Sequence, residues 1–501
     1  MSIPIPNVAQ LKEFDLMTLE KESISSLELM ERASNVFTNW FCEKFPDHNI
    51  PIHIFSGNTN NGADGLAIAR LLNEKGYVVS VFLCNFSEKK NLDFEANLKR
   101  LKSKKSILIQ SLSEEEIAQL TISTNPIIII DALIGYACNK EFEEPWSTLI
   151  QKINTSNQPI VSVDMPSGMF ADRTDTINCI NATHTLSFEF PKLSFLLPEN
   201  GASAGDWNYN SIGLNYLDQH EKNFPYNFLE LSDIKSIFKP RRKFAHKYTN
   251  GHVLLIAGSH KMAGAALLAA SASMRSGAGL VSVCIPEILF KIVHEFVPEA
   301  ICINLEELMI HSENSNYHAI AIGPGLGKHA TMEAIFELIR NYDLPTVIDA
   351  EAINYLASNK HHVRNLPKNS ILTPHAGEFD RLFGTKRNTL ERIETARKKA
   401  GDHNLIIILK GRYSAICLPS GKVFFNSTGN PGLATAGSGD VLTGMIAAFL
   451  SHQYTAEESC MLACYLHGIA GDLAAENYTS ECMIARDIIE YIPSSVQHIM
   501  G

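Results

Sequence analysis

The sequence predicts an α/β protein with two successive domains, and three observations lead to this prediction. The chain has 501 residues, which is too long for a single hydrophobic core. Short apolar runs alternate with helical patterns in both halves, which predicts parallel sheets covered by helices. A polar stretch over residues 215–223 interrupts this alternation, so we expect domains over residues 1–220 and 225–501.

The first half opens with a helical pattern that includes residues 26–33. A buried strand is predicted over residues 51–55, followed by a glycine- and asparagine-rich turn. A helix over residues 66–74 and a strand over residues 77–83 follow. This order is a βαβ unit, and repeated βαβ units build a parallel sheet.

Two further strands are predicted over residues 127–130 and 160–163, and they end at Asp131 and Asp164 respectively. In open α/β sheets, ligands bind at the carboxyl ends of the strands. We therefore expect both carboxylates to lie at a binding site.

The turn over residues 56–65 reads S-G-N-T-N-N-G-A-D-G. Its glycines let the backbone approach a ligand closely, and the start of the following helix offers free N–H groups to an anion. The loop is neither the dinucleotide-binding G-x-G-x-x-G nor a Walker loop. Taken alone, it predicts either a phosphate or polar ligand, or a tight turn capped by Asn and Asp side chains.

The second half contains a further series of strand patterns, each followed by a loop with glycine, proline or polar residues. The predicted strands cover residues 252–257, 280–285, 319–322, 346–348, 370–372 and 405–409. Glycine-rich or polar loops lie at residues 258–266, 323–327, 373–378 and 429–432.

The most informative segment of the second half is Gly437-Ser438-Gly439-Asp440, which begins an apolar helix that runs to Phe449. Backbone amides at the start of that helix would stabilise the charge of a transferring phosphoryl group. Asp440 is placed to accept the proton of the hydroxyl that is phosphorylated. The alternative is an aspartate that only caps the helix.

Composition and charge exclude several classes of protein. Apolar residues make up 45% and charged residues 19%, which is ordinary for a globular protein. The net charge of −11 argues against nucleic-acid and anionic-membrane partners, because both favour basic surfaces. No apolar run approaches the ~20 residues that cross a bilayer, and no secretory signal is visible. Ten scattered cysteines predict free thiols and a cytoplasmic location.

The motifs of the first half resemble the NAD(P)HX epimerase domain, whose substrate is hydrated NAD(P)H. They are the loop at residues 57–65, Asp-Ala at 131–132, V-D-M-P-S-G at 163–168 and F-P-K at 190–192, followed by Gly201 and Gly205. The resemblance covers about residues 10–215. It implies a Rossmann-like three-layer αβα domain that binds the hydrate along the first loop and coordinates K⁺.

The resemblance also implies roles for individual residues of the first half. Asp164 would be the general acid/base of epimerisation. The K⁺ ligands would be Asn61, Asp131 and Ser167. The hydrate would be bound by Asn60, Asn61, Gly62, Ala63, Asp64, Gly135 and Asp164.

This half departs from the family at the turn over residues 135–140. Tyr136 and Ala137 stand where the family has a glycine-rich turn, and Lys140 takes the place of an arginine. Ala63 also fills a common glycine position. A domain that binds a ligand without catalysis is therefore the alternative to an active epimerase.

The second half resembles the ribokinase-like superfamily, and within it the ADP/ATP-dependent NAD(P)HX dehydratases. The motifs are M-A-G-A at 262–265, G-P-G-L-G at 323–327, D-A-E-A at 349–352, T-P-H-x-x-E at 373–378 and K-G at 410–411. The resemblance spans about residues 235–495. It implies that a nucleotide phosphorylates the hydroxyl of the S-hydrate, after which phosphate leaves and the dihydronicotinamide ring is restored.

The dehydratase resemblance implies Mg²⁺ bound with ADP or ATP, with Glu378 organising the metal through water. Asp349 would support the loops, and Asp440 would be the catalytic base. The hydrate would contact Ala265, Gly327, His375 and Asp440. The nucleotide would be bound by Lys410, Gly411, Arg412, Tyr413, Ser414 and Gly439.

Together the two halves predict an enzyme that epimerises R- and S-NAD(P)HX and dehydrates the S form. Its partners would be NADHX, NADPHX and ADP or ATP, and it is a possible homo-oligomer. The alternative is a ribokinase-like small-molecule kinase with a catalytically silent ligand-binding N-terminal domain. A stable phosphorylated product in place of NADH would favour that alternative.

Overall fold

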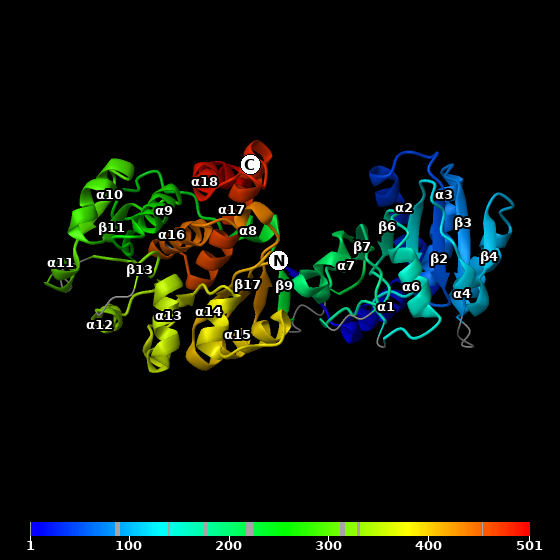
Figure 1. Ribbon diagram of the computed structural model, residues 1–501, viewed down its shortest axis with the longest axis horizontal. Coiled ribbons are helices and arrows are strands. Elements are labelled where there is room, and N and C mark those ends of the chain that lie inside the picture. The colour runs from blue at the N-terminus through cyan, green and yellow to red at the C-terminus, as the bar shows by residue number, and fades with distance from the viewer. Residues whose placement is uncertain are drawn as a thin grey trace. The chain divides into compact units, whose positions relative to one another are not determined.

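The protein is described by a computed structural model that covers residues 2–500 except 86–90, 139–140, 175–177, 217–223, 311–315, 328–330 and 453 (Figure 1). The chain forms two compact units. One is Pro4–Phe224, and the other is Pro225–Gly501 together with Met1–Ile3. Lys140, the expected substitute for an arginine, lies outside the described residues.

The described strands of the N-terminal unit form a seven-stranded sheet in the order β4-β3-β2-β5-β6-β7-β8, and neighbouring strands are parallel throughout. The strands are β2 (Ile52–Gly57), β3 (Val79–Cys84), β4 (Leu108–Ser111), β5 (Ile128–Ala132), β6 (Ile160–Val163), β7 (His184–Phe188) and β8 (Asp206–Asn210). The helices are α1 (Val8–Glu22), α2 (Ser26–Lys44), α3 (Asn60–Glu74), α4 (Leu92–Lys102), α5 (Glu114–Gln119), α6 (Trp146–Asn154) and α7 (Gly201–Ala204).

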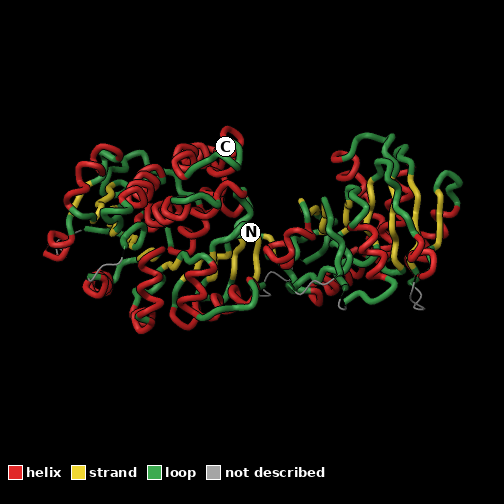
Figure 2. The backbone as a smooth tube through the Cα atoms, viewed as in Figure 1, coloured by secondary structure: helices red, strands yellow, loops and turns green. Residues whose placement is uncertain are grey.

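Alternate residues of the central strands pack into two different hydrophobic clusters, so helices cover both faces of this sheet. On β2, Ile54 packs into one cluster and Phe55 into the other. On β5, Ile130 packs into the first of these clusters and Ile129 into the second. This alternation confirms an α/β unit with three layers, visible as yellow strands between red helices (Figure 2).

The order of the strands reverses at β2, because β3 pairs with one edge of this strand and β5 with the other. In open α/β sheets a ligand crevice forms at such a switch point, beyond the carboxyl ends of the strands. The loops after β2 and β5 therefore meet where a ligand is expected.

The turn predicted over residues 56–65 is shorter than expected, because α3 already begins at Asn60. The Thr59 hydroxyl accepts a hydrogen bond from the Gly62 N–H and caps the helix. A Cβ at Gly62 would lie 1.6 Å from the Gly57 carbonyl oxygen, so only glycine fits there. The prediction of a turn was wrong for residues 60–65 because glycine and asparagine favour turns in the absence of this cap.

The described strands of the C-terminal unit form an 11-stranded sheet in the order β1-β9-β18-β17-β16-β15-β14-β13-β10-β11-β12. Strands from β12 to β16 are parallel along this order, whereas β17 is antiparallel to both β16 and β18. The strands are β1 (Ile3–Pro4), β9 (Tyr226–Phe228), β10 (His252–Ile256), β11 (Leu280–Cys284), β12 (Ile301–Ile303), β13 (Ala319–Ile322), β14 (Thr346–Ile348), β15 (Ile371–Leu372), β16 (Ile406–Leu409), β17 (Ala415–Cys417) and β18 (Val423–Phe425).

Small residues allow two central helices of this unit to approach closely. A Cβ at Gly444 of α16 would lie 2.2 Å from the Ala269 carbonyl oxygen of α9. Most of α16 is buried, which fixes the position of its first turn. The helices are α8 (Leu231–Ile237), α9 (Ala263–Arg275), α10 (Phe290–Phe296), α11 (Leu305–Ile310), α12 (Met332–Tyr342), α13 (Ala350–Ser358), α14 (Ala376–Phe383), α15 (Thr389–His403), α16 (Ser438–Ser451), α17 (Ala456–Tyr478) and α18 (Ala485–Met500).

Among the described residues, no helix is both long enough and apolar enough to cross a bilayer.

Candidate active sites

A cavity of about 1310 Å³ lies within the N-terminal unit, at the switch point of its sheet. The first turn of α3 contributes Asn60, Asn61 and Asp64 to its wall, and the loops after β5 and β6 contribute Gly135 and Asp164. Five of the predicted hydrate-binding residues therefore line one cavity. Gly62 and Ala63 are buried and are not among the lining residues, and Ala63 packs inside a hydrophobic cluster.

Two polar groups of this cavity are buried without a described partner. They are the Asn61 amide nitrogen and the Asp64 Oδ1 oxygen. Burial raises the pKa of Asp64 well above its usual value, and the nearby Asp164 and Asp15 raise it further. Buried polar atoms are nearly always hydrogen-bonded in folded proteins. Their presence in the wall of a cavity is typical of a site that binds a polar ligand.

Asp164 lies at the centre of a buried hydrogen-bond network. Its backbone is left-handed, with φ of 63°, which turns the chain sharply after β6. Its Oδ2 accepts the Tyr136 N–H at 3.2 Å, and its Oδ1 lies 2.9 Å from the Lys192 ammonium. The Lys192 side chain is 1% exposed, and Ser187 is another of its hydrogen-bond partners. This network holds one carboxylate rigidly at the edge of the cavity.

Asp131 is fully buried behind the loop that follows β5. Its Oδ1 accepts the Ser167 hydroxyl at 2.5 Å, and its Oδ2 accepts the Ser167 N–H and the Ser162 hydroxyl, both at 2.8 Å. Burial raises the pKa of Asp131, and these hydrogen bonds counteract part of that effect. The structure thus brings together two of the three predicted K⁺ ligands. Asn61 borders the same loop, because a Cβ at Gly135 would lie 3.3 Å from its Oδ1.

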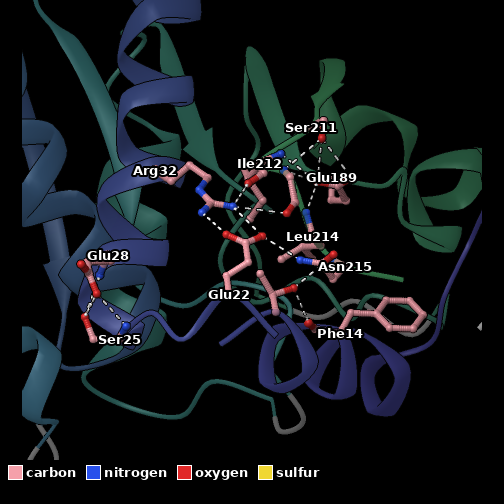
Figure 3. A network of polar contacts seen from close by, with 12 residues as sticks. Phe14, Glu22, Ser25, Glu28, Arg32, Glu189, Ser211, Ile212, Leu214 and Asn215 are labelled. Carbon is pink, nitrogen blue, oxygen red and sulfur yellow. Dashed lines mark hydrogen bonds and ion pairs between the residues drawn. The ribbon is translucent and has the colours of Figure 1, made fainter. Parts of the chain in front are cut away.

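Ile212 and Leu214, from the segment over residues 211–215, line one side of the cavity. Figure 3 shows this segment with its polar contacts. Its position is fixed by the Glu189 carboxylate, which accepts the N–H groups of Ile212, Gly213 and Leu214 at 2.8, 3.0 and 3.2 Å. Three successive amides directed at one carboxylate form an anion-binding nest. The segment is therefore part of the wall of the site.

Arg32 and Asn215 join this segment to the two N-terminal helices (Figure 3). The Arg32 guanidinium donates to the Ile212 carbonyl and forms an ion pair with Glu22. Asn215 donates its N–H to the Thr18 hydroxyl at 2.8 Å. These contacts bind helices α1 and α2 to residues 211–215, the last described segment of the N-terminal unit before residue 216.

In the C-terminal unit, Asp440 lies in the first turn of α16, and this helix begins directly after Gly437, whose φ is 89°. The first turn of α9 and the loop after β13, which both carry predicted hydrate contacts, also pack together: a Cβ at Gly325 would lie 2.8 Å from the Ala265 Cβ. On the same loop as Gly325, Gly327 lies close to Ser259.

An ion pair between the half-buried Lys410 and the buried Asp349 lies beside the start of α16. The Lys410 ammonium donates to Asp349 Oδ1 at 2.8 Å, and the Thr443 hydroxyl of α16 donates to Asp349 Oδ2 at 2.8 Å. A Cβ at Gly439 would lie 3.3 Å from the Lys410 nitrogen. Burial lowers the pKa of Lys410, but the neighbouring carboxylates outweigh this effect and raise it. A fixed cation therefore lies next to free amides of a helix N-terminus, which suits a phosphate group.

Burial raises the pKa of Asp440 to about 7, with a further contribution from Asp349 that Lys410 counteracts in part. A carboxyl with this pKa is close to the ideal for a general base at neutral pH. For Asp440 as the predicted base, we expect kcat/KM of the predicted dehydration to be half-maximal near pH 7 and to fall about tenfold per pH unit below it, because protonation removes the proton acceptor. Turnover of S-hydrate at concentrations well below KM, as a function of pH, measures this. A rate that stays constant down to about pH 5 would contradict the prediction.

His375 and Glu378 form the cap of α14. His375 Nδ1 accepts the N–H of Gly377 at 3.0 Å, and Glu378 Oε2 accepts the N–H of His375 at 2.9 Å. The His375 side chain is 54% exposed, so its other face is open to a ligand. The remaining predicted nucleotide residues, at 411–414, form the turn between β16 and β17, where Arg412 stacks on Tyr413 at 4.8 Å.

Helix α17 holds both glycine loops of this site, a role that the sequence analysis missed. Asp472 accepts the Gly429 N–H at 2.9 Å and the Asn430 amide at 3.0 Å. His467 Nε2 lies 3.1 Å from the Ser438 carbonyl oxygen. Burial lowers the pKa of His467 to about 4, so the ring is neutral and its Nε2–H donates. The signal was the sequence H-G-I-A-G-D at 467–472, where His and Asp interrupt an apolar helix.

Two known families match this chain in succession. The family described as YjeF-related protein N-terminus matches residues 26–194, and the family described as NAD(P)H-hydrate dehydratase matches residues 253–494. The "Bifunctional NAD(P)H-hydrate repair enzyme Nnr" of Moorella thermoacetica is 32% identical over 98% of this chain and 96% of its own length. The chain belongs to the bifunctional NAD(P)H-hydrate repair enzymes. The Escherichia coli enzyme of the same name is 30% identical over 95% of this chain and 89% of its own length.

A solved structure of the repair-enzyme type supports the fold of the C-terminal unit. It is the ADP/ATP-dependent NAD(P)H-hydrate dehydratase of Bacillus subtilis, co-crystallised with ATP/Mg²⁺. It has a TM-score of 0.50 and 32% identity, and it covers 54% of this chain and 98% of its own. A ribokinase-like superfamily protein from Enterococcus faecalis has the same TM-score at 27% identity and covers 55% of this chain and 96% of its own. The expected ribokinase-like fold, the bifunctional repair activity and the nucleotide dependence are confirmed.

Proposed function

We propose that residues 1–220 epimerise the hydrated cofactor in the cavity beside Asp164, and that residues 225–501 dehydrate the S form at Asp440 with ADP or ATP. The observation that carries the second assignment is the half-buried Asp440 at the start of α16, beside the Lys410–Asp349 ion pair. The cavity with Asp164 and Lys192 in its wall carries the first.

In the proposed dehydration, the hydroxyl oxygen of the substrate attacks the terminal phosphoryl group of the nucleotide, and the Asp440 carboxylate accepts the hydroxyl proton. The α16 amides at Gly439 and the Lys410 ammonium stabilise the developing charge. Phosphate then leaves with the electrons of the carbon–oxygen bond, and loss of a ring proton restores the double bond. Phosphorylation thus converts a poor leaving group into a good one.

The other predicted contacts keep their proposed roles. Ala265, Gly327 and the exposed face of His375 bind the hydrate, and residues 410–414 bind the nucleotide. When bound, Mg²⁺ would neutralise nucleotide phosphate charge, with Glu378 as an oxygen donor through water. Glu378 is buried close to the site and has carboxylate oxygens to offer, which fits this role.

The residues around Asp131 fit a monovalent cation. The described hydrogen-bond partners of its carboxylate are hydroxyls and amides, all of them neutral, although it is fully buried. A buried charge with neutral partners is costly, and a cation would balance it. Hard oxygen atoms from Asp131, Ser167 and Asn61 would hold K⁺ there and keep the loops after β5 and β6 in place.

The ten cysteines are all free, which suits a reducing compartment such as the cytoplasm.

The test of both assignments is to supply pure R- and pure S-hydrate of NADH and of NADPH, with ADP or ATP in turn. We expect S-hydrate to regain the dihydronicotinamide absorbance with a nucleotide alone. R-hydrate should regain it at a rate that Asp164→Asn lowers to the spontaneous level, while S-hydrate turnover by that variant stays normal. A stable phosphate ester in place of NADH would indicate a small-molecule kinase and overturn the proposal.

A further inference from the structure

The cavity of the N-terminal unit contains a second hydrogen-bonded acidic group besides Asp164. Asp15 of α1 accepts the Tyr136 hydroxyl at 2.6 Å, and both side chains line the cavity. The backbone N–H of the same tyrosine donates to Asp164 Oδ2 at 3.2 Å. Asp15 and Asp164 therefore contact opposite ends of Tyr136, and both carboxyl groups line the cavity.

The two carboxyl groups have different surroundings. Asp164 is paired with the buried Lys192 ammonium, which stabilises its anion. Asp15 bonds instead to the uncharged phenol, and burial raises its pKa, with Asp164 adding to the rise while Tyr136 and Lys192 oppose it. Asp64, whose own pKa is well raised by burial, is the other carboxyl coupled to Asp15. A carboxyl group paired with a cation suits the role of the base, and a carboxyl group bonded to a neutral phenol suits the role of the acid.

We propose that Asp15 with Tyr136 is the second acid–base group of the epimerase, acting on the face of the substrate ring opposite to Asp164. This inference rests on the proposed epimerase function of the cavity. It assigns a task to Tyr136 in the turn where the chain departs from the glycine-rich family pattern.

The proposed reaction balances without any oxidant or reductant. The Asp15 carboxyl donates a proton to the departing hydroxyl, and the carbon–oxygen bond breaks with its electron pair on oxygen, which releases water. The lone pair of the ring nitrogen forms a carbon–nitrogen double bond. Water then adds to the other face of the carbon, and Asp164 takes its proton. Each turnover therefore leaves Asp15 without one proton and Asp164 with one more. Epimerisation in the opposite direction restores both groups, or the proton returns through solvent.

The test uses the full-length chain without nucleotide, so that the dehydratase is idle, and resolves R- and S-hydrate by chromatography. We expect Asp15→Asn to lower the enzymatic epimerisation rate by about 10²-fold or more. Tyr136→Phe removes a hydrogen bond that lowers the pKa of Asp15, so we expect it to shift the alkaline limb of the pH–rate profile to higher pH. A purely structural role for Tyr136 would leave the position of that limb unchanged.

Folding is checked independently in each unit. All three tryptophans, Trp40, Trp146 and Trp207, lie in the N-terminal unit, so their fluorescence reports its unfolding alone. Turnover of S-hydrate with nucleotide reports the C-terminal unit. Glu20→Gln, on the exposed side of α1, is the matched control and should leave epimerisation unchanged. If Asp15→Asn fails to fold, Tyr136→Phe, which loses one hydroxyl, decides the question.

The possible outcomes separate this inference from the function on which it rests. If Asp164→Asn abolishes epimerisation while Asp15→Asn and Tyr136→Phe keep normal rates and pH profiles, the second acid–base group is overturned and the site stands. If Asp164→Asn retains the wild-type rate, the assignment of the cavity itself is wrong. Loss of rate in Asp15→Asn with a shifted limb in Tyr136→Phe supports the proposal.

Discussion

Replacing Asp440 by asparagine is expected to lower kcat for S-hydrate dehydration by about 10²- to 10⁴-fold, the range typical of a lost general base. Asparagine has nearly the same shape but cannot accept the hydroxyl proton. Because Asp440 lies in the first turn of a buried helix, the change should leave the fold intact. Regain of dihydronicotinamide absorbance from pure S-hydrate with ADP or ATP measures it.

The matched control is Asp402→Asn, an exposed aspartate near the end of α15, which should keep full activity. Epimerisation of R- to S-hydrate by the Asp440 variant should also be normal, since that activity is assigned to the other unit. A variant that retains more than about a tenth of wild-type turnover would show that Asp440 is a helix cap and that another group is the base.

Replacing Lys192 by methionine is expected to destabilise the N-terminal unit by about 3–5 kcal/mol, because it leaves the Asp164 carboxylate buried without its cation. The two side chains are 1% and 5% exposed, so water cannot compensate. Urea unfolding followed by tryptophan fluorescence measures the change in this unit alone.

Two variants check the cause of that effect. Lys104→Met breaks an ion pair of similar length, 2.8 Å, whose partners are 37% and 42% exposed, and should cost less than about 1 kcal/mol. Adding Asp164→Asn to Lys192→Met should restore part of the stability, because it removes the unpaired charge. An equal loss in the Lys104 and Lys192 variants would contradict the explanation.

The sequence was sufficient to predict elements with strong local signals. Strand β6 was predicted at its observed bounds, and β2, β3 and β5 within two residues at each end, because each is a short apolar run in a buried sheet. Strand β8 was not identified, since Asp206–Asn210 is polar and alternates between exposed and half-buried positions at the sheet edge. The start of α3 was misplaced because the Thr59 cap depends on the tertiary turn around Gly57.

Site residues that lie in recognisable sequence motifs were predicted. Site residues whose contacts join segments far apart in the sequence were missed. Asp164 and Asp440 each lie in a recognisable motif. Asp15 is separated by 121 residues from its partner Tyr136 and stands in an ordinary helix, so nothing local indicates it. Lys192 was part of a noted F-P-K segment, yet its pairing with Asp164 depends on the sharp turn after β6. Contacts of this kind depend on topology, which local patterns do not encode.

The cavity wall has a consequence for dissecting the protein into modules. The matched N-terminal family covers residues 26–194, whereas Asp15 and Leu214, which both line the cavity, fall outside this range on either side. The hydrogen bond between Thr18 and Asn215 closes a loop of 197 residues, so the first and last segments of the unit complete the wall together. An excised module cut at the boundaries of sequence similarity would lose both segments. A separate epimerase module therefore has to extend from before α1 to beyond Asn215.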